Sequence, residues 1–351
     1  MKQKHAIRFI ALAVVAILLA GCVHDFPTMT KDGEEGIDPT LVEVNTEVTL
    51  DLELVPLEII TDPNRSGDRK AETGTKAAAD YRRRFIIEAW RDGKPESRQV
   101  TVMDDAEGGG EDGGEKITLP IHLRLHAVEY TLAVWTDYVA TGTDTDLYYD
   151  TDNLQQVACT DPYTGSTPYR DCLYGTAALD LRQYRDEWNA KVQVKVDMVR
   201  PLAKYELIAT DVAEFLERTA QQRAQGESYT VTFSYSFYIP AVFDVLAGKP
   251  CESWPEISFT LPLALPEEGE TLHTVGSDFI FANGGEASVL LTMEIRDSRG
   301  NRMSRVSGID VPYRRGHLTT LKGAFLTSEM KGGVEIDTEW DGEVEIDIDN
   351  L

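Results

Sequence analysis

Apolar and polar residues alternate along much of the chain after residue 40, and this alternation constrains the fold more than any other feature. One long example begins at Val44 and reads VNTEVTLDLELVPLEI. A β-strand projects successive side chains to opposite faces, so a period of two is typical of a strand with one buried face. The same period returns in AKVQVKVDMV and, near the C-terminus, in GGVEIDTEWDGEVEIDI. The chain is therefore expected to be rich in β-strands.

The order of the other segments indicates the fold class. An Asp-Gly pair at 92–93 follows RRRFIIEAW and is typical of a hairpin turn, and KITLPIHLRLHAVEYTLAVWTDYV holds two further strands. A second series of strands begins at Tyr229, after ATDVAEFLERTAQQRAQG, whose apolar residues fall on one face of a helix. We expect an all-β fold, with two antiparallel β-sandwich domains in tandem and one short helix between them.

The 351 residues leave room for about two domains. A lipoprotein signal peptide, a flexible tether and two sandwich domains are expected, and their ranges are 1–21, 22–40, 41–205 and 206–351.

The N-terminus predicts export and lipid attachment. Lys2, Lys4 and Arg8 precede an apolar run of roughly a dozen residues, which is shorter than the ~20 residues of a membrane span. The run ends in Leu-Ala-Gly-Cys at residues 19–22, which resembles the bacterial lipobox, in which the cysteine sulfur carries the lipid. The alternative is a short buried helix with a chance cysteine. We expect a covalent lipid on Cys22, no other cofactor, and a location in the outer membrane at the cell surface.

The charge balance excludes one class of partner. Asp and Glu number 60 against 34 Lys and Arg, which gives a net charge of −26. So acidic a surface repels phosphate backbones, and we therefore expect no nucleic-acid partner.

The remaining three of the four cysteines allow one disulfide. Cys159 and Cys172 close a short polar loop and could pair in an oxidising compartment, which leaves Cys251 over. The sequence leaves open whether they pair, because it does not fix the geometry that a disulfide needs.

No constellation of catalytic residues stands out, and we expect no enzymatic activity. His122 and His126 lie four apart, a spacing that can bind zinc on a helix. They occur in a strand pattern with Arg124 between them, where they share the solvated face and are too far apart to share a metal. A solvated face is therefore the preferred interpretation.

The polar excursion over residues 141–175 holds the weak site signals. Its carboxylates Asp144, Asp146, Asp150 and Asp152 are candidate Ca²⁺ ligands, but the spacing of an EF-hand fails and an ordinary hydrated acidic loop is preferred, so no metal is predicted. Five tyrosines of this excursion could form a recognition surface or could pack over a sheet edge: Tyr148, Tyr149, Tyr163, Tyr169 and Tyr174.

Three regions carry a resemblance to a known family. They read YTLAVWTDYV and LYYDTDNL over 130–154, VRPLAKYELIATD at 199–211 and IDVPYRRGHLTTLKGAFLT at 309–327. With the lipobox, they resemble Bacteroidales surface lipoproteins of the fimbrillin and fimbrial-anchor kind, and are most similar to a variant known only as a domain of unknown function. The resemblance implies transthyretin-like β-sandwiches that polymerise by strand exchange. Fimbrial subunits or other surface proteins are then the expected partners, with the membrane reached through the lipid.

Family stalk subunits lose their first strand to an Arg-specific protease, and this chain offers basic residues at Arg82, Arg83 and Arg84. The alternative, which we favour, is that these arginines begin the strand that contains FIIEAW. An uncleaved chain would keep its first strand and its lipid, as an anchor should.

The C-terminus is a candidate donor strand. Its alternating apolar residues include Val334, Ile336, Val344, Ile346 and Ile348, which could add to the sheet of a neighbouring subunit. Alternatively, Asp341-Gly342 turns a hairpin that closes the chain's own sandwich, which is the preferred interpretation.

These observations lead to one main functional hypothesis and one alternative. The main hypothesis is a non-enzymatic, lipid-anchored cell-surface protein that acts as a fimbrial anchor or fimbrium-associated subunit through strand-exchange contacts. The alternative is a surface lipoprotein that binds a glycan or host ligand through its 141–175 loop.

Overall fold

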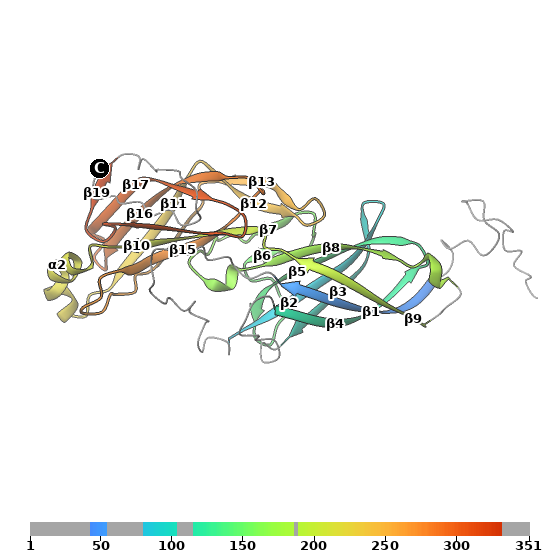
Figure 1. Cartoon of the computed structure of the whole chain (residues 1–351). Helices are drawn as coiled ribbons and strands as arrows, with labels where there is room; N and C mark the ends of the chain where they lie inside the picture. The colour runs from blue at the N-terminus through green and yellow to red at the C-terminus, as the bar shows by residue number, and fades with distance from the viewer. Residues whose placement is uncertain (1–42, 55–79, 104–114, 186–188, 332–351) are drawn as a thin grey trace, which may run out of the picture. The chain divides into compact units, whose positions relative to one another are not determined.

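A computed structural model describes residues 43–54, 80–103, 115–185 and 189–331. The predicted signal peptide and lipidation site at Cys22, the tether, and the candidate donor strand of Val334, Ile336, Val344, Ile346 and Ile348 lie outside these ranges. Within them, strands dominate and the all-β prediction is confirmed (Figure 1).

The first half of the chain contributes strands β1 to β9, which have these bounds: β1 Glu43–Leu54, β2 Tyr81–Arg91, β3 Lys94–Met103, β4 Glu115–His126, β5 Glu129–Ala140, β6 Tyr149–Asp150, β7 Val157–Cys159, β8 Leu173–Asp180 and β9 Asn189–Met198. Two short 3₁₀ turns, η3 Pro168–Arg170 and η4 Arg182–Tyr184, lie among them.

The second half contributes strands β10 to β19 and one helix, which have these bounds: β10 Leu202–Ala209, α2 Val212–Ala224, β11 Tyr229–Ser236, β12 Tyr238–Asp244, β13 Lys249–Pro255, β14 Ser258–Pro262, β15 His273–Phe281, β16 Ala287–Asp297, β17 Arg302–Tyr313, β18 Leu318–Gly323 and β19 Glu329–Lys331.

Within the described residues the strands form five sheets, in the orders β4-β1-β9, β3-β2-β5-β8, β13-β12-β7-β6, β15-β10-β18 and β14-β11-β16-β17-β19. The long neighbouring strands with a determined register pair antiparallel, as expected. The pairs β10–β18 and β17–β19 are parallel, which local periodicity does not predict.

The chain divides into two compact units. The smaller contains, of the described residues, 43–47, 122–129, 180–185 and 189–191, and the larger contains the rest. In the smaller unit Val44, Ala127 and Ala190 form a buried cluster against which Tyr184 packs. The expected boundary between two sandwich domains at residues 205 and 206 stays a prediction.

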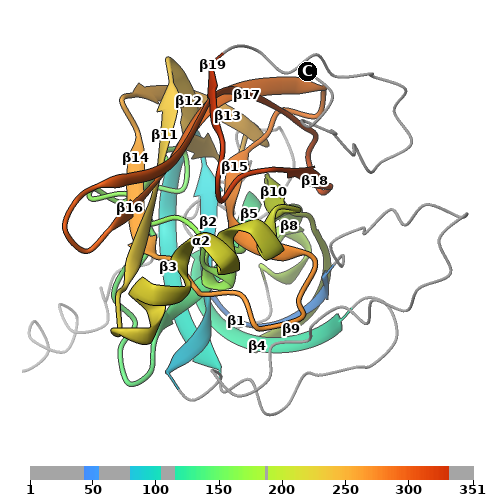
Figure 2. The same cartoon turned by 90° about the vertical axis from the view of Figure 1, so that its left-hand side faces the viewer.

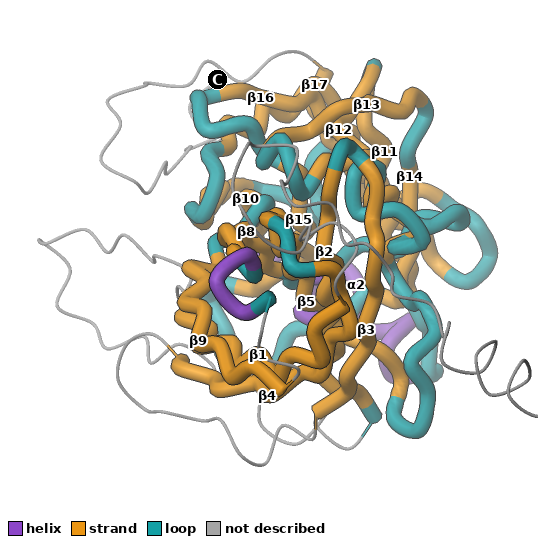
Figure 3. The backbone as a smooth tube through the Cα atoms, turned by 90° about the vertical axis from the view of Figure 1, so that its right-hand side faces the viewer, coloured by secondary structure: helices purple, strands orange, loops and turns teal. Residues whose placement is uncertain are grey.

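The first strand matches its sequence pattern closely. Its even-numbered residues from Val44 to Leu52 are buried, while the residues between them are half-buried or exposed. β1 is the middle strand of its sheet, and Figure 3 shows it between β4 and β9. A strand in this position is bonded along both edges, so it is an integral part of the fold.

The predicted helix is present as α2, with Val212 and Phe215 buried. Asp211 precedes its first residue, but the Asp211 carboxylate accepts hydrogen bonds from the backbone N–H groups of Leu326 at 3.1 Å and Thr327 at 2.7 Å. Figures 1 and 2 together show α2 at one end of the strands β10, β11 and β16. Asp211 therefore ties the start of the helix to the segment that follows β18.

The segment YTVTFSYSFYI, which reads as one strand in the sequence, forms two. Phe237 separates β11 from β12 and has a φ of 66°. This left-handed backbone conformation breaks the extended chain, and β11 and β12 consequently belong to different sheets.

Candidate functional site

The polar excursion over residues 141–175 is packed into the larger unit. Its strands β6 and β7 pair with each other, and β7 pairs with β12 through Val242 and Phe243. None of its five tyrosines is fully exposed: Tyr149 and Tyr174 are buried, and the other three are half-buried. The excursion therefore packs over a sheet edge, the second of the two alternatives that its sequence left open.

A buried arginine organises this excursion. Arg170 lies in η3 with only 2% of its side chain exposed, and its Nη1 donates to Asp278 Oδ1 at 2.6 Å. Asp278 lies on β15, 108 residues further along the chain. The Arg170 guanidinium also lies 4.1 Å from the centre of the Tyr163 ring. An ion pair with so little water around it is stable only when the remaining donors and acceptors are also satisfied.

Further hydrogen bonds occupy the remaining acceptor positions of the Asp278 carboxylate. Tyr163 Oη donates to Asp278 Oδ2 at 2.8 Å, and Tyr235 Oη donates to the same oxygen at 2.7 Å. The backbone N–H of Phe279 donates to Asp278 Oδ1 at 2.8 Å. Burial raises the pKa of Asp278, and Arg170 together with the tyrosine hydroxyls opposes that shift. The cluster therefore fixes the excursion to β11 and β15 as a structural centre.

The two cysteines of the predicted disulfide lie at the same centre. Cys159 and Cys172 are both buried and both are free thiols in the structure, while Cys251 is exposed. Arg170 Nη2 donates to Cys159 Sγ at 3.4 Å, and burial raises the pKa of the Cys159 thiol to about 11. Burial also raises the pKa of Cys172 well above its usual value. Thiols in this state are poor nucleophiles, and the disulfide stays a prediction.

A second buried arginine lies on β2. Arg84 Nε donates to Asp137 Oδ1 at 2.9 Å and its Nη2 donates to Asp137 Oδ2 at 2.6 Å, with both side chains 3% exposed. Arg84 also pairs with Asp146 at 2.7 Å and donates to the carbonyl of Asp144 at 2.8 Å. Burial raises the pKa of Asp137, and the hydrogen bonds from Arg84 oppose this shift. Arg84 therefore joins β5 to the start of the acidic loop.

All three arginines of the candidate cleavage site lie inside β2. Arg83 and Arg84 have backbone partners on both β3 and β5, and Arg82 has one on β5. This placement agrees with the favoured interpretation, in which the arginines begin a strand. A protease binds an extended, unpaired chain, so β2 would have to leave its sheet before cleavage at any of these residues.

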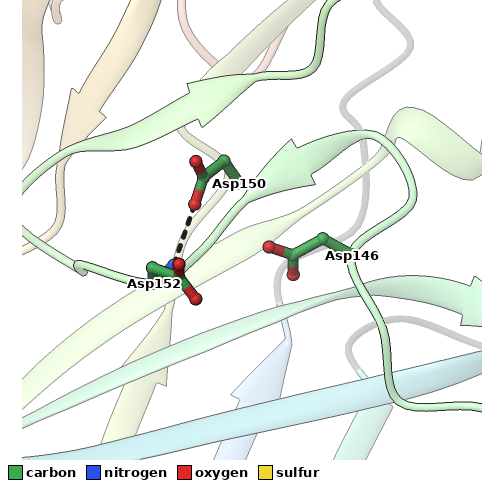
Figure 4. A group of neighbouring side chains, drawn as sticks. All are labelled: Asp146, Asp150 and Asp152. Atoms are coloured by element: carbon green, nitrogen blue, oxygen red, sulfur yellow. Dashed lines mark hydrogen bonds between the residues drawn. The ribbon is translucent and has the colours of Figure 1, made fainter.

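The calcium candidates divide into a cluster and an outlier. Figure 4 shows Asp146, Asp150 and Asp152 near one another, with ligand oxygens that lie within 4.8 Å of each other. Asp144 is not in this group and meets Arg84 only through its backbone carbonyl.

Protein donors already occupy much of the cluster's acceptor capacity. The Asp146 carboxylate accepts from the backbone N–H of Thr151 at 2.9 Å and the Thr151 hydroxyl at 2.8 Å, besides pairing with Arg84. Asp150 Oδ1 accepts from the backbone N–H of Asp152 at 3.1 Å. These bonds are those of an ordered acidic turn, and the Arg84 guanidinium neutralises one of its carboxylates, that of Asp146.

The histidines that the sequence singles out lie on β4. His122 and Arg124 are exposed and His126 is half-buried, whereas the alternating residues Ile121, Leu123 and Leu125 are buried. This is the predicted solvated face of a strand.

Sequence reasoning missed the Arg170–Asp278 centre. Arg170 stands in a polar, Tyr- and Pro-containing stretch that has no periodicity, and its partner lies more than a hundred residues away. The one local signal is the isolated Asp278 in HTVGSDFIF, which places a charge in an otherwise apolar strand end. A charge in such a place needs a partner, although the sequence alone does not identify it.

Comparisons with known proteins give one family and several distant structures. The model of DUF6562, described as a family of unknown function, matches residues 39–349. The chain is similar to a "putative cell adhesion protein" from Bacteroides eggerthii at 12% identity and a TM-score of 0.40, over 87% of this chain and 99% of that one. It is also similar to a fimbrial assembly protein from Parabacteroides distasonis at 13% identity and a TM-score of 0.35, over 80% and 91%. No curated protein matches the chain.

Proposed function

We propose the following function for this chain, which belongs to DUF6562, a family of unknown function. The proposal is based on the chain's own residues and geometry. It is a non-enzymatic lipoprotein of the cell surface that acts as an anchor or accessory subunit of a protein fibre. Cys22 carries the lipid, residues 22–40 form the tether, and the folded part makes the protein–protein contacts.

The position of β1 is the observation that carries this proposal. The first described strand begins at Glu43, only 21 residues after Cys22 by the numbering, and it is the middle strand of β4-β1-β9. Its core-facing residues Val48 and Leu50 have no exposed surface. A pull on the lipid would reach the fold through this strand, which is bonded along both edges. Force from an external assembly would then meet a complete sheet.

Retention of β1 also bears on how the chain would join an assembly. In strand exchange, a donor strand fills a groove that an absent strand leaves open. Because β1 fills its own place here, the chain would not accept a donor strand at that position. Its own C-terminal segment, with Val334 and Ile346, remains the candidate donor, and it lies outside the described residues.

Within residues 43–331 as described, no helix is long and apolar enough to span a membrane. The alternative of ligand binding through the 141–175 excursion has less support from the geometry, because its tyrosines pack inward and Arg170 is enclosed. We therefore propose a single function, in which attachment resides in the lipid and assembly resides in strand contacts.

Co-purification from outer membranes tests this function. The full-length chain, with an affinity tag inserted within residues 104–114, is captured from detergent-solubilised membranes of its native host. The proposal expects a ladder of polymerised β-rich subunits with the intact chain, and loss of that ladder when residues 332–351 are deleted. The shortened chain retains Asp211 and Thr327, and therefore keeps the hydrogen bond that joins the start of α2 to the segment after β18. Capture of the monomer alone from intact chain would contradict the assembly role.

A further inference from the structure

The outer face of the sheet β14-β11-β16-β17 is hollowed. A depression of about 360 Å³ lies over its middle strands, where side chains of β11, β16 and β17 line it: Thr232, Ser234, Ser236, Thr292, Glu294 and Arg305. The opposite face of β11 carries Val231, Phe233 and Tyr235, which belong to the hydrophobic core. We call the depression the hydroxyl groove. Along β11, small hydroxyl side chains occupy the outward positions and large apolar side chains occupy the inward positions, which leaves space on the outer face.

The hydroxyl groove offers hydrogen-bonding groups that the protein itself does not use. Ser234 on β11 lies directly opposite Thr292 on β16, and Ser236 follows two positions later. The side-chain hydroxyls of these three residues have no protein partner in the described part of the chain, whereas Thr232 Oγ1 lies 2.8 Å from Thr260 Oγ1. Each free hydroxyl can both donate and accept, which suits a ligand that is itself rich in hydroxyl groups.

The groove is lined by one carboxylate, that of Glu294, and by two guanidinium groups, those of Arg296 and Arg305, in a molecule whose net charge is negative. Glu294 has both carboxylate oxygens engaged, one by Arg296 Nε and the other by Arg305 Nη1 at 3.0 Å. Its side chain is only 14% exposed, whereas that of Arg305 is 48% exposed. An arginine has five N–H donors, and within the described residues the Arg305 side chain uses one of them on Glu294. The groove therefore presents guanidinium donors to the solvent in a chain of net charge −26.

Two aromatic residues adjoin the groove along the chain. Phe237 and Tyr238 directly follow Ser236, and with 74% and 67% of their surface exposed they are the most exposed large hydrophobic residues of the described ranges. The φ of Phe237 is 66°, a conformation that bulky residues rarely adopt. An exposed ring gains little from packing, so stability does not account for a phenylalanine at this strained position. Strain of this kind is concentrated where a side chain has a role in binding.

We propose that the hydroxyl groove binds a uronic acid-containing glycan. The sugar hydroxyls would bond to Ser234, Ser236 and Thr292, and the sugar carboxylate would pair with Arg305. The apolar faces of the sugar rings would lie against the exposed aromatic pair. This proposal is independent of the anchor role, since it concerns the outer face of a sheet and requires neither the lipid nor a donated strand.

A peptide fits this surface less well than a glycan. A peptide that adds to a sheet uses the free main-chain groups of an edge strand. β11 is paired with β14 on one side and β16 on the other, and β16 is paired in turn with β17. The groove therefore offers side chains only, and the hydroxyl-rich composition of its lining favours a polyhydroxylated ligand over an acidic peptide.

Calorimetry with the full-length, detergent-solubilised chain tests the proposal. The probes are a hexamer of galacturonic acid, the same hexamer with its carboxyl groups methyl-esterified, and a hexaglutamate peptide. The proposal expects the free acid to bind roughly tenfold or more tightly than the ester, because hydrogen bonds to a charged group contribute more than neutral ones. Absence of binding by the free acid, equal binding of the ester, or equal binding of hexaglutamate would each overturn the proposal.

Variants at matched positions locate the site. Arg305→Gln should weaken binding of the free acid by roughly tenfold, and Phe237→Gly should weaken it while relieving the backbone strain. Arg299→Gln is the matched control, because Arg299 is exposed on the same β16–β17 hairpin and does not line the groove. Thr292→Val keeps the size of the side chain and removes its hydroxyl, so it should also weaken binding of the free acid. It tests the site even if Arg305→Gln folds poorly. Equal loss in Arg299→Gln and Arg305→Gln would show diffuse charge attraction and overturn the proposal.

Discussion

Strands β2 and β11 both lie between two partner strands, yet they bury their side chains differently. On β2 the seven residues from Arg84 to Trp90 are all buried, whereas on β11 buried and half-buried or exposed residues alternate from Tyr229 to Ser236. Ile86 and Trp90 join a core that contains Tyr149 and Phe243, so the packed excursion and β12 cover this face of β2. One sheet is therefore covered on both faces around β2, and the other is open on one face around β11.

The difference determines what a polar side chain does in each sheet. On β2 the buried Glu88 accepts from Trp90 Nε1 at 2.8 Å and pairs with Arg98, because a charge inside a covered sheet needs partners. On β11 the outward Ser234 and Ser236 make no side-chain hydrogen bond to the described part of the protein, and both line the hydroxyl groove. Polar residues of the covered sheet hold the fold together, and those of the open sheet remain available to a ligand.

Two cross-strand arginine–carboxylate pairs give the sharpest test of this comparison. Arg84 lies opposite Asp137 in the covered sheet, and Arg305 lies opposite Glu294 in the open one. Arg84→Met leaves Asp137 buried without its cation, and we expect it to lower the free energy of unfolding by about 3–5 kcal/mol. Arg305→Met should lower it by less than about 1 kcal/mol, because that arginine is half-exposed. Urea unfolding followed by circular dichroism measures both, and equal losses would refute the distinction.

Neighbouring alanine substitutions give the next largest effect. Ile86→Ala and Ile87→Ala should each lower the free energy of unfolding by about 2–5 kcal/mol, since both faces of β2 are buried. On β11, Phe233→Ala should cost about 3–5 kcal/mol while Ser234→Ala should change stability by less than about 0.5 kcal/mol. The same urea titration checks all four variants. A small loss for either isoleucine would show that one face of β2 is open.

The smallest effect concerns the pH dependence of the open sheet's hairpin. Hydrogen bonds from Asn301 and from the backbone N–H of Arg299 lower the pKa of Asp297, which lies at the end of β16. A lowered folded-state pKa contributes stability above the unfolded value of about 3.9, and that contribution is lost as the pH falls through the folded value. Asp297→Asn should therefore melt at a lower temperature than the parent at pH 6, and the difference should shrink below pH 4. A difference that grows on acidification would contradict this sign.

Local patterns in the sequence predicted the parts of the fold that depend on neighbouring residues. Alternation predicted the buried face of β1, the Asp92-Gly93 pair predicted the turn between β2 and β3, and the apolar stripe predicted α2. The turn residues Asp92 and Gly93 both have positive φ, as such hairpins require.

Long-range partners could not be predicted in the same way. The pairing of β7 with β12 and the ion pair of Arg170 with Asp278 join residues more than eighty positions apart, and neither leaves a periodic trace. The polar composition of residues 141–175 predicts a solvated loop. In the structure, polar side chains of this segment such as Arg170 and Tyr163 instead make hydrogen bonds inside the fold. The break at Phe237 was also missed, because alternation continues through it while the backbone turns. The hydroxyl groove could not be predicted for the same reason. It depends on the register of β11 with β16, which places Ser234 opposite Thr292 and which the sequence does not reveal.

The release of the chain from cells tests the anchor role most directly. The parent keeps its own signal peptide and lipobox with Cys22, and the Cys22→Ser chain is exported behind a signal peptide whose cleavage needs no lipid. The fraction of protein in the culture medium is then measured by quantitative immunoblotting of medium and outer membranes. We predict that the parent stays in the membrane fraction, and that Cys22→Ser appears in the medium together with any fibre that it holds. Retention of the Cys22→Ser protein and its fibres on the cells would contradict the account, because an attachment other than the lipid would then bear the load.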